Sequence, residues 1–476
     1  MNTFKSEALD YAEQRQSHWN LTNTDGVPLA AKYYRHKVIE IYRQLIPEGA
    51  SVLEVGCGGG ALLGALKPRL GVGVDFSSIA IDQARLAHPH LTFVQADAQS
   101  LSFATHTFEY IVLSDLVNEL WDVQQVLEAL LQMCTPQTRI IFNFYSHLWN
   151  IPLATAQKLG IASKRLEQNW LTPQDVRNLL EISGFDLLRS WSDIIAPVDV
   201  PLISNFSNRY LAKIFPFRAL NLANFAVARP HATPSQKQPT VSVVVAARNE
   251  SGHIEELFSR IPEMGGGTEI IFVEGNSTDD TYAAIERVLA QHPERRCKLL
   301  KQPGKGKGDA VRAGFDAATG DILMILDADI TVPPEDLPRF YEIMANGSAE
   351  FVNGVRLVYP MDGDAMRFLN LLGNKFFSWA FSWLLGQPIR DTLCGTKVLW
   401  RNDYQRIANN RAYFGDFDPF GDFDLLFGAA KLNLKIMEIP IRYRARRYGE
   451  TNISRWSHGW LLLKMVAFAA KRIKFV

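Results

Sequence analysis

The chain has 476 residues, more than the ~100–200 of a typical domain, so we expect two or three domains that each bury a core of their own. With 50 Lys and Arg against 50 Asp and Glu, the formal net charge is +0, which excludes a global field that would draw the protein to nucleic acid. The 4 cysteines show neither metal-ligand spacing nor a pairing rhythm, and this favours reduced thiols in a cytosolic enzyme over a disulfide framework.

Neither a signal peptide nor a membrane-spanning helix is expected. The N-terminus lacks the basic segment and apolar run of a signal peptide. The most apolar stretches, 368–385 and 460–470, are interrupted by polar residues and fall short of the ~20 apolar residues that a spanning helix needs. We therefore expect a cytoplasmic protein, either soluble or peripheral at the inner face of the membrane.

The chain divides into two halves of the same kind. Short runs rich in Val, Ile and Leu alternate with longer amphipathic segments, which is typical of parallel sheets built from βαβ units. The stretch 228–240 is rich in Pro, Thr and Gln and has no apolar period, so it reads as a linker. We predict an α/β domain over 1–228, a linker over 229–240 and a second α/β domain over 241–476. Strands are expected near 51–55, 71–75, 91–94, 110–113, 139–144, 241–246, 269–273, 298–301, 321–326 and 350–353. Helices are expected between the strands, and in the second half they start near Ser277, Lys307 and Pro334.

Polar and glycine residues follow successive strands of the first half. The strand that ends at Val55 runs into the glycine-rich segment 56–60, where the backbone can pass close to a ligand. Such a loop is also found in dinucleotide enzymes and in plain tight turns. Asp75 ends the second strand, where a carboxylate can accept both hydroxyls of a ribose, and Asp97 follows the third. Ser114 follows the fourth strand, so all of these residues are expected at the carboxyl edge of one sheet, where such folds bind ligands.

This ordered set resembles the class I methyltransferases that use S-adenosylmethionine (SAM), over about residues 30–228. The resemblance implies a Rossmann-like fold in which the glycine loop holds the methionine part of SAM, Asp75 the ribose and Asp97 the adenine. The residues it assigns to SAM are Glu54, Gly56, Cys57, Gly58, Asp75, Phe76, Asp97, Ala98 and Ser114. A helix cap or turn is the structural alternative for the two aspartates.

The methyl acceptor of this half stays open. Transfer to oxygen needs a base, and the candidates near the strand ends are Asp115, Glu119, Tyr145 and His147, each of which also has a purely structural interpretation. This half could also bind SAM without transferring its methyl group.

The second half carries a different series of motifs. Its first two strands deliver 247–250 and 274–279, and a glycine- and lysine-rich segment at 303–308 precedes a helix, which favours a phosphate there. The strand ending near Leu326 leads into Asp327 and Asp329, a pair suited to a hard cation such as Mg²⁺ or Mn²⁺. That cation would neutralise a leaving diphosphate, although two spaced aspartates also occur in many surface loops.

In this order the motifs are similar to family 2 glycosyltransferases of the GT-A fold, over 241 to about 460, within the branch of the dolichol-phosphate mannose and glucose synthases. The resemblance implies a UDP- or GDP-sugar donor and a metal on Asp327 and Asp329. The residues it assigns to the nucleotide-sugar are Ala247, Arg248, Asn249, Glu250, Glu274, Lys307, Asp327, Ala328 and Asp329. That family usually has two acids after its second strand, whereas this chain has Glu274 and Gly275, so the nucleotide stays open.

The same resemblance assigns an acceptor site. Arginine binds phosphate oxygens in pairs through its planar fork, and the residues assigned to an acceptor phosphate are Arg356, Arg390, Cys394 and Arg446. The alternative for Cys394 is a small buried residue. Asp422 and Asp424 are the candidate catalytic acids: a hydroxyl acceptor needs a general base, whereas a polyprenyl phosphate, with a second pKa of ~6, is already an anionic nucleophile.

Apolar and basic residues near the C-terminus suggest a lipid-linked acceptor. The apolar cluster between Met366 and Leu385 fits either a buried helix or one lying in a membrane interface. Arginines at 442–447 precede Trp456 and Trp460, a combination typical of membrane surfaces.

The sequence therefore predicts a bifunctional peripheral membrane enzyme that transfers a sugar to a lipid-linked acceptor and methylates a related glycan or lipid intermediate. The alternatives are a glycosyltransferase whose first half is a SAM-binding regulator, and one that acts on a hydroxyl acceptor. A non-catalytic protein that binds membranes or nucleic acid is disfavoured by the two sets of motifs and the balanced charge.

Overall fold

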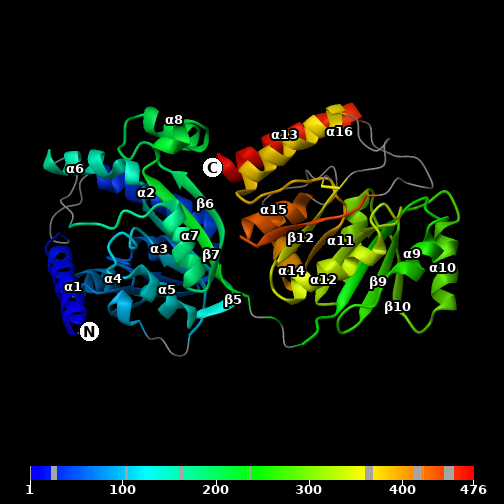
Figure 1. Cartoon of the computed structure of the whole chain (residues 1–476), viewed down its shortest axis with the longest axis horizontal. Coiled ribbons are helices and arrows are strands. Elements are labelled where there is room, and N and C mark those ends of the chain that lie inside the picture. Colours follow the sequence, from blue (N-terminus) through cyan, green and yellow to red (C-terminus); the bar gives the residue numbers. More distant parts are fainter. Residues whose placement is uncertain are drawn as a thin grey trace. The chain divides into compact units, whose positions relative to one another are not determined.

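The computed structural model describes residues 2–22, 29–101, 106–159, 166–232, 234, 237–356, 358–359, 368–411, 421, 423–443 and 455–475. It forms two compact units, Met1–His231 and Ala232–Lys474, which are described separately. In each unit a sheet carries helices on both faces (Figure 1).

In the described part of the first unit the sheet has 7 strands in the order β3-β2-β1-β4-β5-β7-β6. The strands are β1 (Ser51–Val55), β2 (Leu70–Asp75), β3 (Thr92–Gln95), β4 (Phe108–Leu113), β5 (Cys134–Tyr145), β6 (Phe185–Asp193) and β7 (Ala223–Pro230). β7 runs antiparallel to both β5 and β6, and Ala223 pairs with Tyr145 on one side and Asp193 on the other. The carboxyl ends of β5 and β6 therefore lie at the same edge of the sheet.

The helices of this unit bury apolar residues against both faces of the sheet. They are α1 (Asn2–Thr22), α2 (Leu29–Leu45), α3 (Ala61–Leu66), α4 (Ser78–Ala87), α5 (Val123–Leu131), α6 (Asn150–Lys158), α7 (Pro173–Ile182) and α8 (Ile203–Arg209), with short 3₁₀ turns η1 (Ala98–Ser100), η2 (His147–Trp149), η3 (Leu211–Lys213) and η4 (Phe217–Leu220). Side chains alternate along β1, so that Val52 joins the cluster with α2 and α3, and Leu53 joins the cluster with α5 and α7.

In the described part of the second unit the sheet also has 7 strands, in the order β10-β9-β8-β11-β13-β12-β14. The strands are β8 (Val241–Ala247), β9 (Thr268–Glu274), β10 (Arg296–Lys301), β11 (Ile322–Asp327), β12 (Phe351–Val355), β13 (Lys397–Trp400) and β14 (Ile436–Pro440). β13 runs antiparallel to β11 and β12. Ala246 pairs with Asp327, and Ala247 pairs with Glu274, so the polar ends of β8, β9 and β11 meet at one edge.

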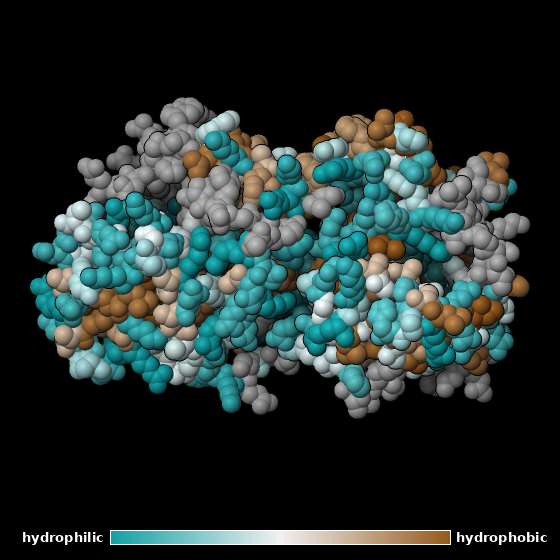
Figure 2. Space-filling view, turned by 180° about the vertical axis from the view of Figure 1, so that it is seen from behind, coloured by the Kyte–Doolittle hydropathy of each residue, from teal (hydrophilic) through white to brown (hydrophobic). Residues whose placement is uncertain are grey.

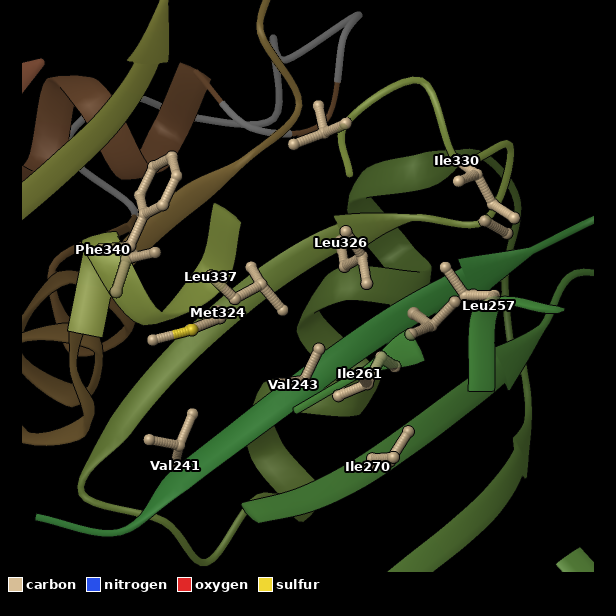
Figure 3. Packing of buried hydrophobic residues seen from close by; sticks show 14 of the residues in the cluster. Val241, Val243, Leu257, Ile261, Ile270, Met324, Leu326, Ile330, Leu337 and Phe340 are labelled. Atoms are coloured by element: carbon tan, nitrogen blue, oxygen red, sulfur yellow. The ribbon is translucent and has the colours of Figure 1, made fainter. Parts of the chain in front are cut away.

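The helices of the second unit are α9 (Ile254–Arg260), α10 (Thr281–Gln291), α11 (Lys307–Ala317), α12 (Leu337–Ala345), α13 (Phe368–Leu385), α14 (Arg401–Asn409), α15 (Phe423–Lys431) and α16 (Arg455–Ala469), with the 3₁₀ turn η5 (Pro334–Asp336) and the π-helical turn η7 (Ala470–Lys474). Figure 3 shows the core between the sheet and the helices α9 and α12. Val243 of β8, Met324 of β11 and Phe340 of α12 are all fully buried there. This packing fixes the direction of the strands whose ends carry the polar motifs.

The α/β fold of both halves is confirmed, but the sheets are mixed rather than purely parallel. All ten predicted strands are present, whereas β6, β7, β13 and β14 were not predicted. The predicted linker begins too early, because Arg229 and Pro230 still belong to β7; Arg229 is buried and pairs with Asp186 of β6. Helix α10 begins at Thr281 rather than near Ser277. Among the helices that the structure describes, none has the length and apolar character that crossing a membrane requires.

Candidate active sites

The glycine loop of the first unit is tied to the end of β2. Gly58, with φ of 50°, donates its N–H to Asp75 Oδ2 at 2.8 Å, and Ser77 N donates to Asp75 Oδ1 at 2.9 Å. Burial raises the pKa of Asp75, and these backbone hydrogen bonds oppose that rise. A buried carboxylate thus stands at the strand end where the sequence predicted a ribose ligand.

Glu54, near the end of β1, links the strand before this loop to the helix after it. Its side chain is buried, and its Oε2 accepts a hydrogen bond from Leu63 N at 3.0 Å at the start of α3. Burial raises the pKa of Glu54 to about 8. Within the loop, Cys57 is buried, and this burial raises the pKa of its thiol.

The remaining residues predicted to bind SAM lie along the same edge. Asp97 is exposed and accepts a hydrogen bond from Gln99 N at 3.0 Å. Asp97 thus caps η1, as the structural alternative for this aspartate expects. Adenine binding by Asp97 stays a prediction. The carbonyl of Phe76 accepts hydrogen bonds from Gln16 at 2.7 Å and from Gln95 at 3.2 Å. Ala98 and Ser114 are half-buried.

A polar network surrounds Asp115, one of the candidate bases. Its Oδ1 accepts hydrogen bonds from the Tyr34 hydroxyl at 2.7 Å and from the Asn143 amide, and Asn143 in turn accepts one from the Tyr42 hydroxyl at 2.9 Å. Glu119, by contrast, is engaged in an ion pair with Arg15. The network therefore distinguishes Asp115 as the candidate whose carboxylate is surrounded by neutral hydrogen-bond donors.

In the second unit, the loops after β8 and β9 are hydrogen-bonded to each other. Asn249, with φ of 57°, receives a hydrogen bond from Thr278 N at 2.8 Å and donates its own N–H to Ser277 Oγ at 3.0 Å. Glu274 is buried and accepts a hydrogen bond from Ser277 N. Ala247 is also buried, whereas Arg248 is exposed.

Two further positions in these loops have clear local surroundings. Glu250 is buried and contacts His253 Nδ1 at 2.9 Å, so it holds the start of α9. Gly275 replaces the family's second acid, and a Cβ there would stand 3.0 Å from Gln302 Oε1 and 3.2 Å from Arg248 Cβ. The backbone is therefore crowded at the position that departs from the family pattern.

Lys307, Asp327 and Gly395 meet at the carboxyl end of β11. The Lys307 ammonium, at the start of α11, forms an ion pair with Asp327. Burial acts to raise the pKa of Asp327. The charge and hydrogen bond of Lys307, together with the charges of two further cations, hold that pKa below its ordinary value. A methyl group added at Gly395 would overlap both the Asp327 carboxylate and the Lys307 ammonium, so the segment before β13 closes over this pair.

Asp329 completes this cluster. Its Oδ1 accepts hydrogen bonds from Thr331 N at 3.2 Å and Thr331 Oγ1 at 2.7 Å. Burial, and then the charge of Asp327, raise the pKa of Asp329. The described residues contain no group of three or more His, Cys, Asp or Glu side chains arranged for a metal. Two neighbouring carboxylates nevertheless fit a cation such as Mg²⁺, which commonly takes its other ligands from phosphate oxygens and water.

The residues predicted to hold an acceptor phosphate have different surroundings. Arg356 forms a bidentate ion pair with Asp391, at 2.7 Å (Nε to Oδ2) and 2.8 Å (Nη2 to Oδ1), whereas the Arg390 side chain is exposed. Cys394 is buried, and burial raises its pKa to about 12. Arg446 lies outside the described residues.

The two candidate catalytic acids are only partly described. Asp424, in the first turn of α15, is buried; its Oδ2 accepts a hydrogen bond from Arg411 Nε at 2.9 Å and lies 3.8 Å from Arg312 Nε. Asp422 lies outside the described residues. Its neighbour Gly421 packs against Gly308, where an added Cβ would stand 2.5 Å from Gly421 Cα, so Gly421 lies at the start of α11.

Sequence reasoning missed the residues that hold these groups in place. Glu438 of β14 accepts hydrogen bonds from Arg390 N at 2.9 Å and from Asp391 N at 3.4 Å, and Asn353 Nδ2 donates to the Asp391 carbonyl at 2.6 Å. In the first unit, Tyr34 and Asn143 were missed in the same way. None of these residues is part of a local motif, so the sequence offered no signal for them.

Comparison with known proteins gives a separate match for each unit. Residues 52–137 match a family model described as a methyltransferase domain, and residues 242–412 match the model of glycosyl transferase family 2. A dolichol-phosphate mannosyltransferase of Pyrococcus furiosus is 37% identical over 110 residues, which cover 23% of this chain and only 31% of that relative. A dolichyl-phosphate hexose transferase of Haloferax volcanii is 27% identical over 230 residues, which cover 48% of this chain and 92% of the relative.

Among solved structures, a SAM-dependent methyltransferase from Mesorhizobium loti matches with a TM-score of 0.33 and 18% identity, covering 40% of this chain and 96% of that chain. The two family matches lie in different units and between them include the glycine loop, Lys307 and both Asp327 and Asp329. The chain therefore joins a methyltransferase domain to a family 2 glycosyltransferase domain.

Proposed function

We propose that the second unit transfers a sugar from a nucleotide-sugar to a polyprenyl phosphate or another lipid-linked acceptor. This proposal rests on the cluster of Lys307, Asp327 and Asp329 at the end of β11, next to the start of α11. The relatives named as dolichol-phosphate mannosyltransferase and dolichyl-phosphate hexose transferase support the choice of substrates.

The charges of this cluster suit a nucleoside diphosphate. Lys307 and the N-terminus of α11 place positive charge where the diphosphate of a UDP- or GDP-sugar would lie. The pKa of Asp329 is raised because its carboxylate is buried and lies near the negative charge of Asp327. A divalent cation bound between them would stabilise both charges. Mg²⁺ or Mn²⁺ held by Asp327 and Asp329 would neutralise charge on the leaving diphosphate.

Of the two candidate bases the structure describes Asp424, and its surroundings favour a phosphate acceptor over a hydroxyl. The acceptor oxygen attacks the anomeric carbon while the bond to the nucleoside diphosphate breaks. A hydroxyl would have to give up its proton to a base, but the Asp424 carboxylate is engaged by Arg411 and lies close to Arg312. A phosphate monoester, with a second pKa of ~6, needs no such base. Asp424 then positions the two arginines, and Arg390 is the exposed cation best able to meet the acceptor phosphate.

A lipid-linked acceptor also fits the surface of this unit. Helices α13 and α16 lie side by side (Figure 1) and expose Trp379 and Trp460. Lys464 lies 5.6 Å from the centre of the Trp460 ring, so basic and aromatic groups stand together as they do at membrane interfaces. We therefore propose that this unit works as a peripheral protein at the inner face of the membrane.

For the first unit we propose methyl transfer from SAM to a related glycan or lipid intermediate. Asp75, Glu54 and the glycine loop would hold the cofactor. Asp115, within its network of Tyr34 and Asn143, is the group placed to orient or deprotonate the acceptor. Covalent linkage would keep two steps of one pathway at high effective concentration.

The glycosyl transfer is tested with the purified chain, Mn²⁺ or Mg²⁺, a panel of UDP- and GDP-sugars and, in separate reactions, a short-chain polyprenyl phosphate or a hydroxyl acceptor. We expect metal-dependent formation of an extractable glycolipid that falls by about 10²-fold or more in Asp329→Ala. The matched control is Glu286→Ala, which removes an exposed carboxylate from α10 and should leave the rate unchanged. Transfer to hydroxyl acceptors alone would overturn the phosphate acceptor, and an unaltered rate in Asp329→Ala would overturn the site.

A further inference from the structure

Two segments of the methyltransferase unit form one layer at the carboxyl edge of its sheet. Residues 147–159 follow β5, residues 194–222 follow β6, and both strands end at this edge. Ser146 N donates to the Leu222 carbonyl at 2.7 Å, and Trp149 Nε1 donates to the Leu220 carbonyl at 2.9 Å. We call this layer, residues 147–159 and 194–222, the cap.

Helix α8 of the cap has its polar side toward the protein. Ser204 is fully buried; its hydroxyl donates to the Val198 carbonyl at 2.6 Å and accepts from Val200 N at 2.9 Å. Asn208, also buried, exchanges hydrogen bonds with the backbone of Ala196 at 2.8 and 2.9 Å. An ordinary surface helix buries its apolar stripe, so α8 is inverted: its polar residues fix the preceding loop and its apolar residues are left outside.

The outer surface of the cap is correspondingly apolar. Leu202 is 89% exposed, Phe215 75% and Ile151 79%, and Ile203 and Phe206 of α8 are exposed as well. Figure 2 shows hydrophobic residues gathered over the α8 region of this unit. Single exposed apolar residues are common, but a contiguous group of this kind marks a surface that binds a partner or a membrane.

The charges of the cap favour an anionic membrane as the partner of this surface. Lys158, Arg209 and Arg218 are exposed, and Asp199 is the one acidic residue in the cap sequence. The fourth cation, Lys213, is paired with Asp193 at the end of β6. Exposed aromatic and aliphatic side chains among cations match the boundary between the headgroups and acyl chains of an anionic bilayer.

The cap is also connected to the methyl-acceptor side of the unit. Asn208 Nδ2 donates to the Tyr33 hydroxyl of α2 at 3.3 Å, and the next residue, Tyr34, donates to Asp115 at 2.7 Å. We propose that the cap docks on an anionic phospholipid surface, so that the methyl acceptor reaches Asp115 from the bilayer. The acceptor part of this proposal rests on the proposed function, whereas the docking itself does not.

Flotation of the full chain with vesicles tests the docking. To remove the two most exposed of the tryptophans that the structure describes in the glycosyltransferase domain, all variants carry Trp379→Ser and Trp460→Ser. In this background we expect binding to vesicles of phosphatidylcholine mixed with phosphatidylglycerol, and ~10-fold weaker binding after Phe206→Ser with Phe215→Ser. Leu86→Ser, which alters an 85% exposed side chain on α4 of the same unit, is the matched control and should bind as the background does. Arg218→Glu should weaken binding to the anionic vesicles only.

The docking proposal can be wrong while the proposed function is right, because flotation needs neither SAM nor a sugar donor. Equal binding by the Phe206→Ser, Phe215→Ser variant and by Leu86→Ser would overturn the docking, and so would absence of binding in the background. Sedimentation velocity gives the third arm: if the phenylalanine substitutions turn an oligomer into a monomer without affecting vesicle binding, the cap joins copies of the chain and the proposal is wrong. The melting temperature of each variant, compared with that of the background, confirms that the unit is folded.

Discussion

Glu54 is a carboxyl group enclosed by the methyltransferase core, and its protonation links stability to pH. Burial raises its pKa to about 8, whereas an exposed glutamate has a pKa of ~4.3. Between these values the folded state holds a proton that the unfolded state lacks. This contribution to stability is therefore fully present below the unfolded pKa and is lost as the pH rises through the folded pKa, at up to ~1.4 kcal/mol per pH unit.

We expect Glu54→Gln, which keeps the oxygen that accepts the hydrogen bond from Leu63 N, to remove this pH dependence. The measurement is the free energy of unfolding of the methyltransferase domain by urea at several values between about pH 5 and about pH 8. The wild type should lose stability across this range more steeply than Glu54→Gln. Glu128→Gln, at an exposed position on α5, should follow the wild type. Parallel profiles for the wild type and Glu54→Gln would show that Glu54 is ionised in the folded protein.

Strand β13 explains how one element completes the proposed donor site. Because it runs antiparallel to β11, the residues just before it arrive at the end where β11 delivers Asp327. Gly395 then lies directly against Asp327 and Lys307. We expect Gly395→Ala to displace both groups and to lower glycosyl transfer by about 10²-fold, because small misplacements of binding groups cost that much.

The rate is measured with the same glycolipid assay, and Gly459→Ala on α16 is the matched control, because an added methyl there has nothing within 4 Å. Sugar transfer at the wild-type rate by Gly395→Ala would mean that this close contact has no part in the reaction. The melting temperature of each variant separates a local effect from general unfolding.

The elements that the sequence predicted are those with a strong local pattern. Parallel strands such as β8 are almost entirely apolar and are followed directly by polar motifs, so the strand and the site residues after it could be predicted together. β13 has only four residues, Lys397–Trp400, and begins with a fully buried lysine, so nothing in its composition marks it as a strand. β7 ends in Arg229 and Pro230, which are typical of a linker, and only the pairing with β6 explains their burial.

Site residues could be predicted where they belong to a local motif, but not where they are held by a distant element. The glycine loop and Asp75 are local motifs that meet in the first unit, and Lys307 and Asp327 are local motifs that meet in the second. The partners that orient the site, such as Asp391 for Arg356, come from distant elements, and their pairing is a property of the folded chain. The ion pairs of Asp424 could not be predicted from the sequence, and they are the reason why we propose that Asp424 positions two arginines instead of acting as a base.

At the scale of the whole molecule, we propose that one chain carries two transfer activities that act on related lipid-linked molecules. If each domain uses its own cofactor or donor, as we propose, single substitutions should abolish the two activities independently. Asp329→Ala removes part of the proposed metal and donor site, and Asp75→Asn weakens the contact between the SAM loop and β2.

The most direct measurement supplies the full chain with SAM labelled in its methyl group, a differently labelled nucleotide-sugar, a divalent cation and a membrane extract, and then counts both labels in the organic phase. The account predicts that both labels enter extractable lipid, that Asp329→Ala loses the sugar label, and that Asp75→Asn loses the methyl label. Sugar label that appears only in water-soluble products, or no methyl label in any product of the wild type, would contradict it.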